Sequence, residues 1–107
     1  MTRGDIVTVA LQGGHGKPRP ALIVQSDRFA QSSHVAVLLL TSVPADAPLL
    51  RIPVDATPET GLASMSFAML DRITTAPRQK IGGIIGRAGD ATMVEVNRAL
   101  AVFLGMA

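Results

Sequence analysis

The segment Lys17-Pro18-Arg19-Pro20 places one arginine directly before an apolar run, residues 21–24. Each proline fixes its own φ at about −65° and disfavours the α region for the residue before it, so the backbone of Arg19 is expected to be extended. A planar, permanently charged guanidinium on a stiff backbone is suited to binding a phosphate group. A solvated arginine at the start of a strand is the alternative interpretation.

An antiparallel pairing brings a hydroxyl to this arginine. If the apolar run after Arg19 forms a hairpin with the next apolar run, pairing Gln25 with Val35 places Thr41 opposite Arg19. Directly opposed residues share one face of a sheet, with Cβ atoms about 5 Å apart. A slip of one residue would put Ser42 in that place and reverse one face. We therefore predict that Arg19 and Thr41 meet, although they are far apart in the sequence.

The turn at residues 44–48 could bring a further side chain, Arg51, beside Thr41 in the same way. An arginine, a hydroxyl and a second arginine would then converge on one side of the sheet. Such donors stabilise a phosphate whose negative charge grows during a reaction. The set lacks an evident general base. His15 lies in a glycine-rich loop, residues 12–17, and is interpreted more readily as a solvated histidine than as a catalyst.

The composition excludes several kinds of site. The 107 residues include no cysteine, which excludes disulfides, thiolate catalysis and cysteine-bound metals. No spacing of ligating side chains indicates a metal site, so neither a metal nor a cofactor is expected. The first residues lack the apolar core of a signal peptide, and the longest aliphatic run, residues 35–40, is far too short to span a membrane. The sequence predicts one domain over residues 1–107, located in the cytoplasm.

Basic side chains are concentrated in one part of the chain. The net charge is only +2, with a pI of about 9.9. Residues 72–87 contain no acidic side chain and four basic ones, which are Arg72, Arg78, Lys80 and Arg87. This pattern favours a polyanion as partner, and a solvated helix end and loop is the alternative. Because phenylalanine is the only aromatic residue type, a nucleic-acid site would depend on charge and hydrogen bonds rather than on stacking.

Runs of apolar residues predict strands over residues 6–11, 21–24, 35–40, 49–54 and 67–75. Residues 27–34 and 44–48 are expected to be turns or loops. The segment 79–85 is ambiguous, because Gly82 and Gly83 weaken a short helix.

The last part of the chain changes to a helical period. Asp90 can cap a helix that begins at Ala91, and Gly105 can end it. The apolar residues on one stripe of this helix are Met93, Val96, Leu100, Phe103 and Leu104. Strands followed by a terminal helix predict a mainly β fold of the α+β class, a small twisted β-barrel or curled sheet with the helix packed on it.

Stretches spread over most of the chain resemble the MazF/PemK family of toxin endoribonucleases. The most specific is residues 17–27, KPRPALIVQSD, which resembles the arginine–proline strand of that family. Residues 70–73, LDRI, stand where a Leu-Asp-Gln-Ile type of segment is usual. The other similar stretches are residues 3–7 (RGDIV), 40–42 (LTS), 60–62 (TGL), 66–75 and 97–105.

The resemblance implies a CcdB/MazF-like fold, a homodimer, and cleavage of single-stranded RNA without metal. It implies attack by the ribose 2′-hydroxyl, a cyclic-phosphate product and inhibition by a cognate antitoxin protein. Operator DNA would be a partner only of the toxin–antitoxin complex. Arg19 matches the catalytic arginine of the family, and Thr41 matches its catalytic hydroxyl residue.

Further RNA contacts are expected from polar and basic side chains, namely Lys17, Ser42, Arg51, Arg72, Arg78 and Lys80. Arg72 replaces a common glutamine and is expected to alter which sequences are cut. The short loop of residues 12–17 is expected to alter how the protein binds RNA. Two other functions stay open, a CcdB-like gyrase poison and a barrel that only binds nucleic acid or protein. The gyrase poison typically ends its helix with a tryptophan before a glycine, and this chain has no tryptophan.

Overall fold

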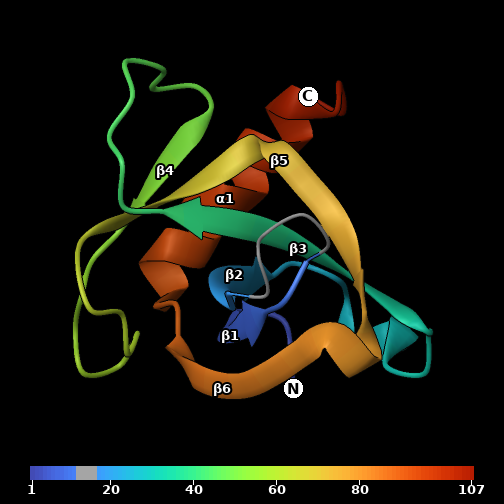
Figure 1. Ribbon diagram of the computed structural model, residues 1–107. Helices are drawn as coiled ribbons and strands as arrows, with labels where there is room; N and C mark the ends of the chain where they lie inside the picture. Colours follow the sequence, from blue (N-terminus) through green and yellow to red (C-terminus); the bar gives the residue numbers. More distant parts are fainter. Residues whose placement is uncertain (12–16) are drawn as a thin grey trace.

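The computed structural model describes residues 1–11 and 17–107, which form an antiparallel sheet and a C-terminal helix (Figure 1). His15 and the glycines around it lie outside the described residues. In chain order the elements are β1 (Asp5–Val9), β2 (Arg19–Ile23), the 3-10 helix η1 (Asp27–Phe29), β3 (His34–Thr41), β4 (Arg51–Val54), β5 (Ser66–Pro77), the 3-10 helix η2 (Arg78–Lys80), β6 (Ile81–Arg87) and α1 (Asp90–Phe103).

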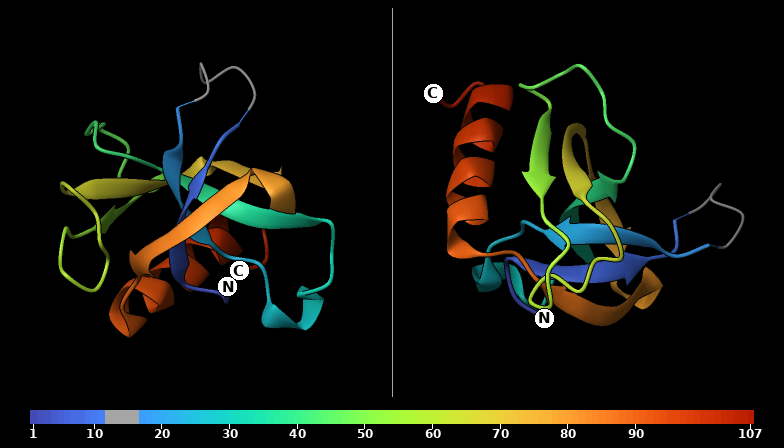
Figure 2. Two further views of the ribbon diagram at one scale, coloured as in Figure 1. Left: turned by 60° about the horizontal axis from the view of Figure 1, so that its bottom comes forward. Right: turned by 90° about the vertical axis from the view of Figure 1, so that its left-hand side faces the viewer.

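The strands follow the order β4-β5-β3-β2-β1-β6 across one sheet, and every neighbouring pair is antiparallel. The sheet curls strongly, but β4 and β6 remain at its two edges (Figure 2). The predicted mainly β fold with a terminal helix is therefore confirmed. The word barrel applies to it only loosely, because the sheet is open.

The central strands β2 and β3 pair in the register that the sequence predicts, with Ala21 opposite Leu39 and Ile23 opposite Val37. Alternate residues of both strands are buried in two different cores, because both faces of this part of the sheet are covered. Burial on both faces explains why these strands are apolar without alternation.

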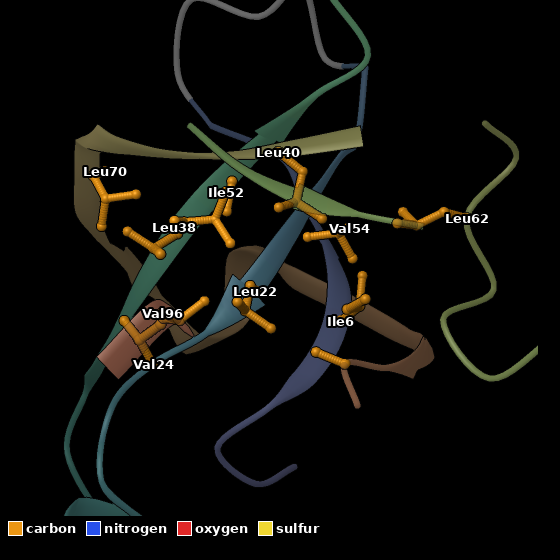
Figure 3. Close-up of a cluster of buried hydrophobic side chains, with 12 residues drawn as sticks. Ile6, Leu22, Val24, Leu38, Leu40, Ile52, Val54, Leu62, Leu70 and Val96 are labelled. Atoms are coloured by element: carbon orange, nitrogen blue, oxygen red, sulfur yellow. The ribbon is translucent and has the colours of Figure 1, made fainter. Parts of the chain in front are cut away.

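The larger core lies between the sheet and α1 (Figure 3) and includes Ile6, Leu22, Val24, Leu38, Leu40, Ile52, Val54, Leu62, Leu70 and Val96. The second core is formed on the other face by Val7, Val9, Ala21, Ile23, Val35, Val37 and Ala76. Buried apolar area of this kind is the main favourable term in folding. The two cores together fix the ends of β2 and β3, which carry Arg19 and Thr41.

The chain after β3 does not return as a hairpin partner of β3. β5 occupies the place beside β3, and β4 pairs with the other side of β5. β5 has twelve residues and is long enough to pair with β3 along its whole length, whereas β4 has four residues and contains Pro53. A proline cannot donate a ladder hydrogen bond and is suited to an edge strand, which is where β4 lies.

The ambiguous segment 79–85 is the end of η2 and most of β6, which pairs with β1. Gly82 permits this close pairing, since a Cβ at that position would lie 2.3 Å from Thr8 Oγ1. The glycines that weaken a helix here are thus explained by the packing of a strand.

Helix α1 differs from the prediction in its N-terminal cap and in the length of its packed apolar stripe. Its N-cap is Gly89, which offers no capping side chain, so the expected cap by Asp90 is wrong. Asp90 instead lies in the first turn, where its negative charge interacts favourably with the positive end of the helix dipole. Val96 is buried, but Phe103 and Leu104 are 41% and 54% exposed, so the apolar stripe that packs on the sheet is shorter than expected. Gly105 follows the helix with a positive φ of 75° and ends it as predicted.

The length and apolar character of the helices show whether any of them could span a membrane. Over residues 1–11 and 17–107, no helix has both the length and the apolar character needed to cross a bilayer.

Candidate active site

A cavity of about 600 Å³ lies where the start of β2, the end of β3 and the middle of β5 meet. Its volume is within the range of small-molecule sites, about 300–1,000 Å³. Four of the residues predicted to form the site line it: Arg19, Thr41, Ser42 and Arg72. The remaining lining is mostly apolar or carries serine hydroxyls.

Arg19 is held in the sheet by its backbone. It pairs with Val9 of β1, whereas the pairing of β2 with β3 runs from Ile23–Val37 to Ala21–Leu39 and so ends two residues before Arg19 and Thr41. Its side chain is exposed at the cavity. The extended backbone expected from the flanking prolines is therefore present, and the guanidinium starts from a rigid strand.

Thr41 is the last residue of β3 and is half-buried. Its Oγ1 accepts a hydrogen bond from the backbone N–H of Val43 at 3.1 Å. A hydroxyl that accepts one bond can still donate its own proton. Thr41 can therefore offer an O–H donor to a ligand in the cavity, next to the donors of Arg19.

One wall of the cavity comes from residues 62–64 and Ser66, which reasoning from residue types missed. The wall follows a tightly fixed turn. Thr60 Oγ1 accepts from the Thr57 N–H at 3.0 Å and donates to the Asp55 carbonyl at 2.7 Å. Gly61 has a φ of +67°, and a Cβ there would lie 1.8 Å from the Ile85 carbonyl oxygen. A threonine–glycine pair signals such a turn, but it does not signal that the next residues line a cavity.

Arg72 reaches the cavity from β5. Its side chain is exposed, and within residues 1–11 and 17–107 it makes no ion pair or side-chain hydrogen bond. Its guanidinium is thus open to an anionic or polar ligand in the cavity that Arg19 also lines.

Arg51 does not lie beside Thr41, so that prediction is wrong. Because β5 separates β4 from β3, Arg51 pairs with Met69 of β5. Its Nη1 binds Asp71 Oδ1 at 2.7 Å, and Arg51 does not line the cavity. The prediction requires the turn of residues 44–48 to join two paired strands, whereas β5 lies between β3 and β4.

The other basic residues also lie outside the cavity lining. Arg78 uses its guanidinium to hold the η1 loop, donating from Nη2 to the Phe29 carbonyl at 3.3 Å and from Nε to the Ser32 carbonyl. Lys17 and Lys80 are exposed. Arg87 binds Asp5 at 2.8 Å. The acid-free stretch is therefore not one continuous binding surface, because two of its four cations have structural partners.

A family match identifies this curled sheet with its terminal helix as belonging to a class of small toxins. The sequence matches the family described as PemK-like, MazF-like toxins of type II toxin–antitoxin systems over residues 2–104. It is also 49% identical over 108 residues to the probable endoribonuclease MazF of Mycolicibacterium smegmatis, covering 100% of this chain and 99% of that relative.

Solved structures agree with this match. An endoribonuclease in complex with its cognate antitoxin, from a mycobacterial species, has a TM-score of 0.79 and 28% identity, covering 100% of this chain and 97% of its own. The Mycobacterium tuberculosis toxin MazF-mt6 has a TM-score of 0.82 at 23% identity, covering 96% and 98%, and supports the fold. The chain belongs to the PemK/MazF family of toxins. The predicted family and enzyme class, a MazF-type endoribonuclease, are confirmed.

Proposed function

We propose that this chain cleaves single-stranded RNA without metal, by attack of a ribose 2′-hydroxyl that leaves a 2′,3′-cyclic phosphate. The observation that carries the proposal is the presence of Arg19 and Thr41 in one cavity, on neighbouring strands of the confirmed register. The names of two relatives, both endoribonucleases, support RNA as the substrate class.

The two residues supply donors where the reaction develops charge. As the 2′-hydroxyl loses its proton and the O2′–P bond forms, the non-bridging oxygens of the phosphate become more negative. The P–O5′ bond then breaks, and the 5′-oxygen gains a proton. Arg19 donates paired hydrogen bonds to the non-bridging oxygens, and the Thr41 hydroxyl donates one more. Donors fixed in place before the reaction stabilise such a transition state more than the starting phosphodiester.

Other side chains bind the RNA on either side of the cleaved bond. Ser42 and Arg72 line the cavity and contact the adjacent nucleotides. Lys17 and Lys80 are exposed outside it and contact phosphates without regard to sequence. Arg78 contributes less than the lysines, because its guanidinium already donates to two carbonyls of the η1 loop.

A cognate antitoxin inhibits the enzyme by covering this cavity, and two chains associate as a homodimer. A structural neighbour bound to its antitoxin supports the first statement. Exposed apolar side chains at the end of α1 support the second, namely Val102, Phe103, Leu104 and Met106.

A single set of cleavage assays tests the chemistry. We expect full cleavage of a single-stranded RNA in EDTA, and 2′,3′-cyclic phosphate ends on the upstream products. The matched control is the same RNA with one 2′-deoxynucleotide on the 5′ side of the cleaved bond, which should resist cleavage at that position alone. Products with free 3′-hydroxyls, cutting at the deoxy position, or activity that a divalent ion restores after EDTA would refute the proposal.

A further inference from the structure

β5 carries a bulge beside the cavity. Leu38 of β3 pairs with Ile73, whereas Leu40 pairs with Ala68, so two steps along β3 correspond to five along β5. The extra residues lie within 69–72, and β5 bends midway along its length (Figure 1). Bulges bend a strand and redirect its side chains, often next to active sites.

Two opposite charges, Asp71 and Arg72, follow one another in this bulge. The carboxylate of Asp71 is bound by Arg51, whose Nη1 lies 2.7 Å from Oδ1, and the same nitrogen donates to the Leu50 carbonyl at 3.0 Å. The Arg51 side chain is 17% exposed and that of Asp71 is 39% exposed, so the guanidinium is shielded from solvent whereas the carboxylate remains open to it. Arg51 thus fastens the bulge of β5 to β4.

This ion pair has two consequences for Arg72. It fixes the backbone at Asp71, which sets the point from which the next side chain extends. It also engages the Asp71 carboxylate, which would otherwise be free to pair with the neighbouring guanidinium of Arg72. Arg72 and Met69, on either side of Asp71 in the bulge, both line the cavity, whereas Arg51 and Asp71 do not.

We propose that Arg51 is a positioning residue of the RNA site. By binding Asp71 it sets the β5 bulge so that Arg72 faces the RNA as a free cation, and Arg51 itself does not touch the RNA. The inference rests on the proposed function, and it gives Arg51 an indirect role in place of the direct RNA contact that the sequence predicts.

A double-mutant cycle tests whether Arg51 acts through Arg72. The proteins are the wild type, Arg51→Met, Arg72→Ala and the double variant. The readouts are kcat/KM on a short RNA with one cleavage site and the cleavage map of a long RNA. We expect Arg51→Met to lower kcat/KM about tenfold, and to change the map in the same direction as Arg72→Ala. The double variant should be no slower than Arg72→Ala alone.

Controls separate positioning from general stability. Asp5→Asn removes the other ion pair of the described residues, whose two members do not line the cavity, so it should lower thermal stability and leave the cleavage map unchanged. Arg51→Lys keeps a cation near Asp71 and should recover part of the wild-type map. If Arg51→Met does not fold, as judged by circular dichroism, Arg51→Gln takes its place in the cycle.

The outcomes distinguish this inference from the function on which it rests. Losses that multiply in the double variant, or an unchanged map in Arg51→Met, would overturn the positioning role while RNA cleavage stands. A wild-type protein that does not cleave RNA would overturn the proposed function, and the positioning role with it.

Discussion

Arg19 and Thr41 line one cavity from neighbouring strands, and each strand is supported on its other side. Arg19 pairs with Val9 of β1, and Thr41 pairs with Phe67 of β5. Both residues therefore project from strands inside the sheet rather than from loops. Because each backbone is held in the sheet by a paired neighbouring strand, the two side chains can be replaced with little expected change to the fold.

Thr41→Val tests the hydroxyl donor with little change of shape. We expect single-turnover cleavage to fall about 10²–10³-fold, because one fixed donor to the developing charge is lost. Thr41→Ser keeps the hydroxyl and the acceptor for the Val43 N–H, so it should retain most activity. Equal cleavage by the valine variant and the wild type, with both folded, would remove Thr41 from the mechanism.

Asp5 should make stability depend on pH. Its Oδ2 accepts from the Thr2 N–H at 2.7 Å, and its Oδ1 accepts from Arg87 Nη1 at 2.8 Å. Burial raises the pKa of Asp5, but the Thr2 hydrogen bond and the Arg87 guanidinium lower it more, so that this pKa lies below its ordinary value of 3.8. A carboxyl with a depressed folded-state pKa stabilises the protein above its unfolded-state pKa. That contribution is lost as the pH falls through the folded-state value.

We therefore expect Asp5→Asn to lower the free energy of unfolding by about 1–3 kcal/mol at neutral pH. The difference from the wild type should shrink as the pH falls below about 4, where the wild-type carboxyl also becomes neutral. Denaturant unfolding at several pH values measures this difference in the free energy of unfolding. A difference that stays constant from neutral to acid pH would show that the charge of Asp5 is not what stabilises this corner.

Gly61 should be required for the turn that leads into the cavity wall. Gly61→Ala forces a β-carbon onto a φ of +67° and towards the Ile85 carbonyl, so we expect a loss of at least about 1–3 kcal/mol of stability. Gly83→Ala is the matched control, because a Cβ there meets no atom within 4 Å. Its effect should stay within about 0.5 kcal/mol. Similar unfolding midpoints for the two variants would contradict this explanation of Gly61.

The end of α1 should contribute to the dimer. Light scattering at micromolar concentration should give about twice the 11.1 kDa mass of one chain. Val102→Glu places a charge among exposed apolar side chains and should shift the mass towards that of the monomer. A wild-type mass of one chain would refute the dimer, and an unchanged dimer in the glutamate variant would place the interface elsewhere.

The sequence allowed the β2–β3 register to be predicted, because two unbroken apolar runs joined by a short turn restrict the pairing. Carried two residues further, the same register brings Arg19 and Thr41 to one end of this strand pair, where both line the cavity. The position of Arg51 could not be predicted in this way. Its strand pairs with β5, which follows it in the chain, and the hydrophobic pattern does not show which of two strands takes the place beside β3.

Other features depend on contacts that a local pattern does not contain. In the sequence, Gly82 indicates only a break in a helix. Its role in close strand packing is evident only from the structure, in which β6 lies against Thr8 of β1. Phe103 and Leu104 continue the apolar period of α1, but both side chains are exposed, which the period alone does not indicate. The wall of residues 62–64 and Ser66 is recognised only from the cavity that these residues line together with β2, β3 and β5.

The most direct test of the central claim is single-turnover cleavage of one RNA by the wild type and by Arg19→Ala in EDTA. We expect a fall of at least about 10²–10³-fold for the variant, because Arg19 is proposed as the main donor to the developing phosphate charge. Circular dichroism and RNA binding confirm that the variant is folded and still holds its substrate. Cleavage at the wild-type rate by a folded Arg19→Ala protein would contradict the account.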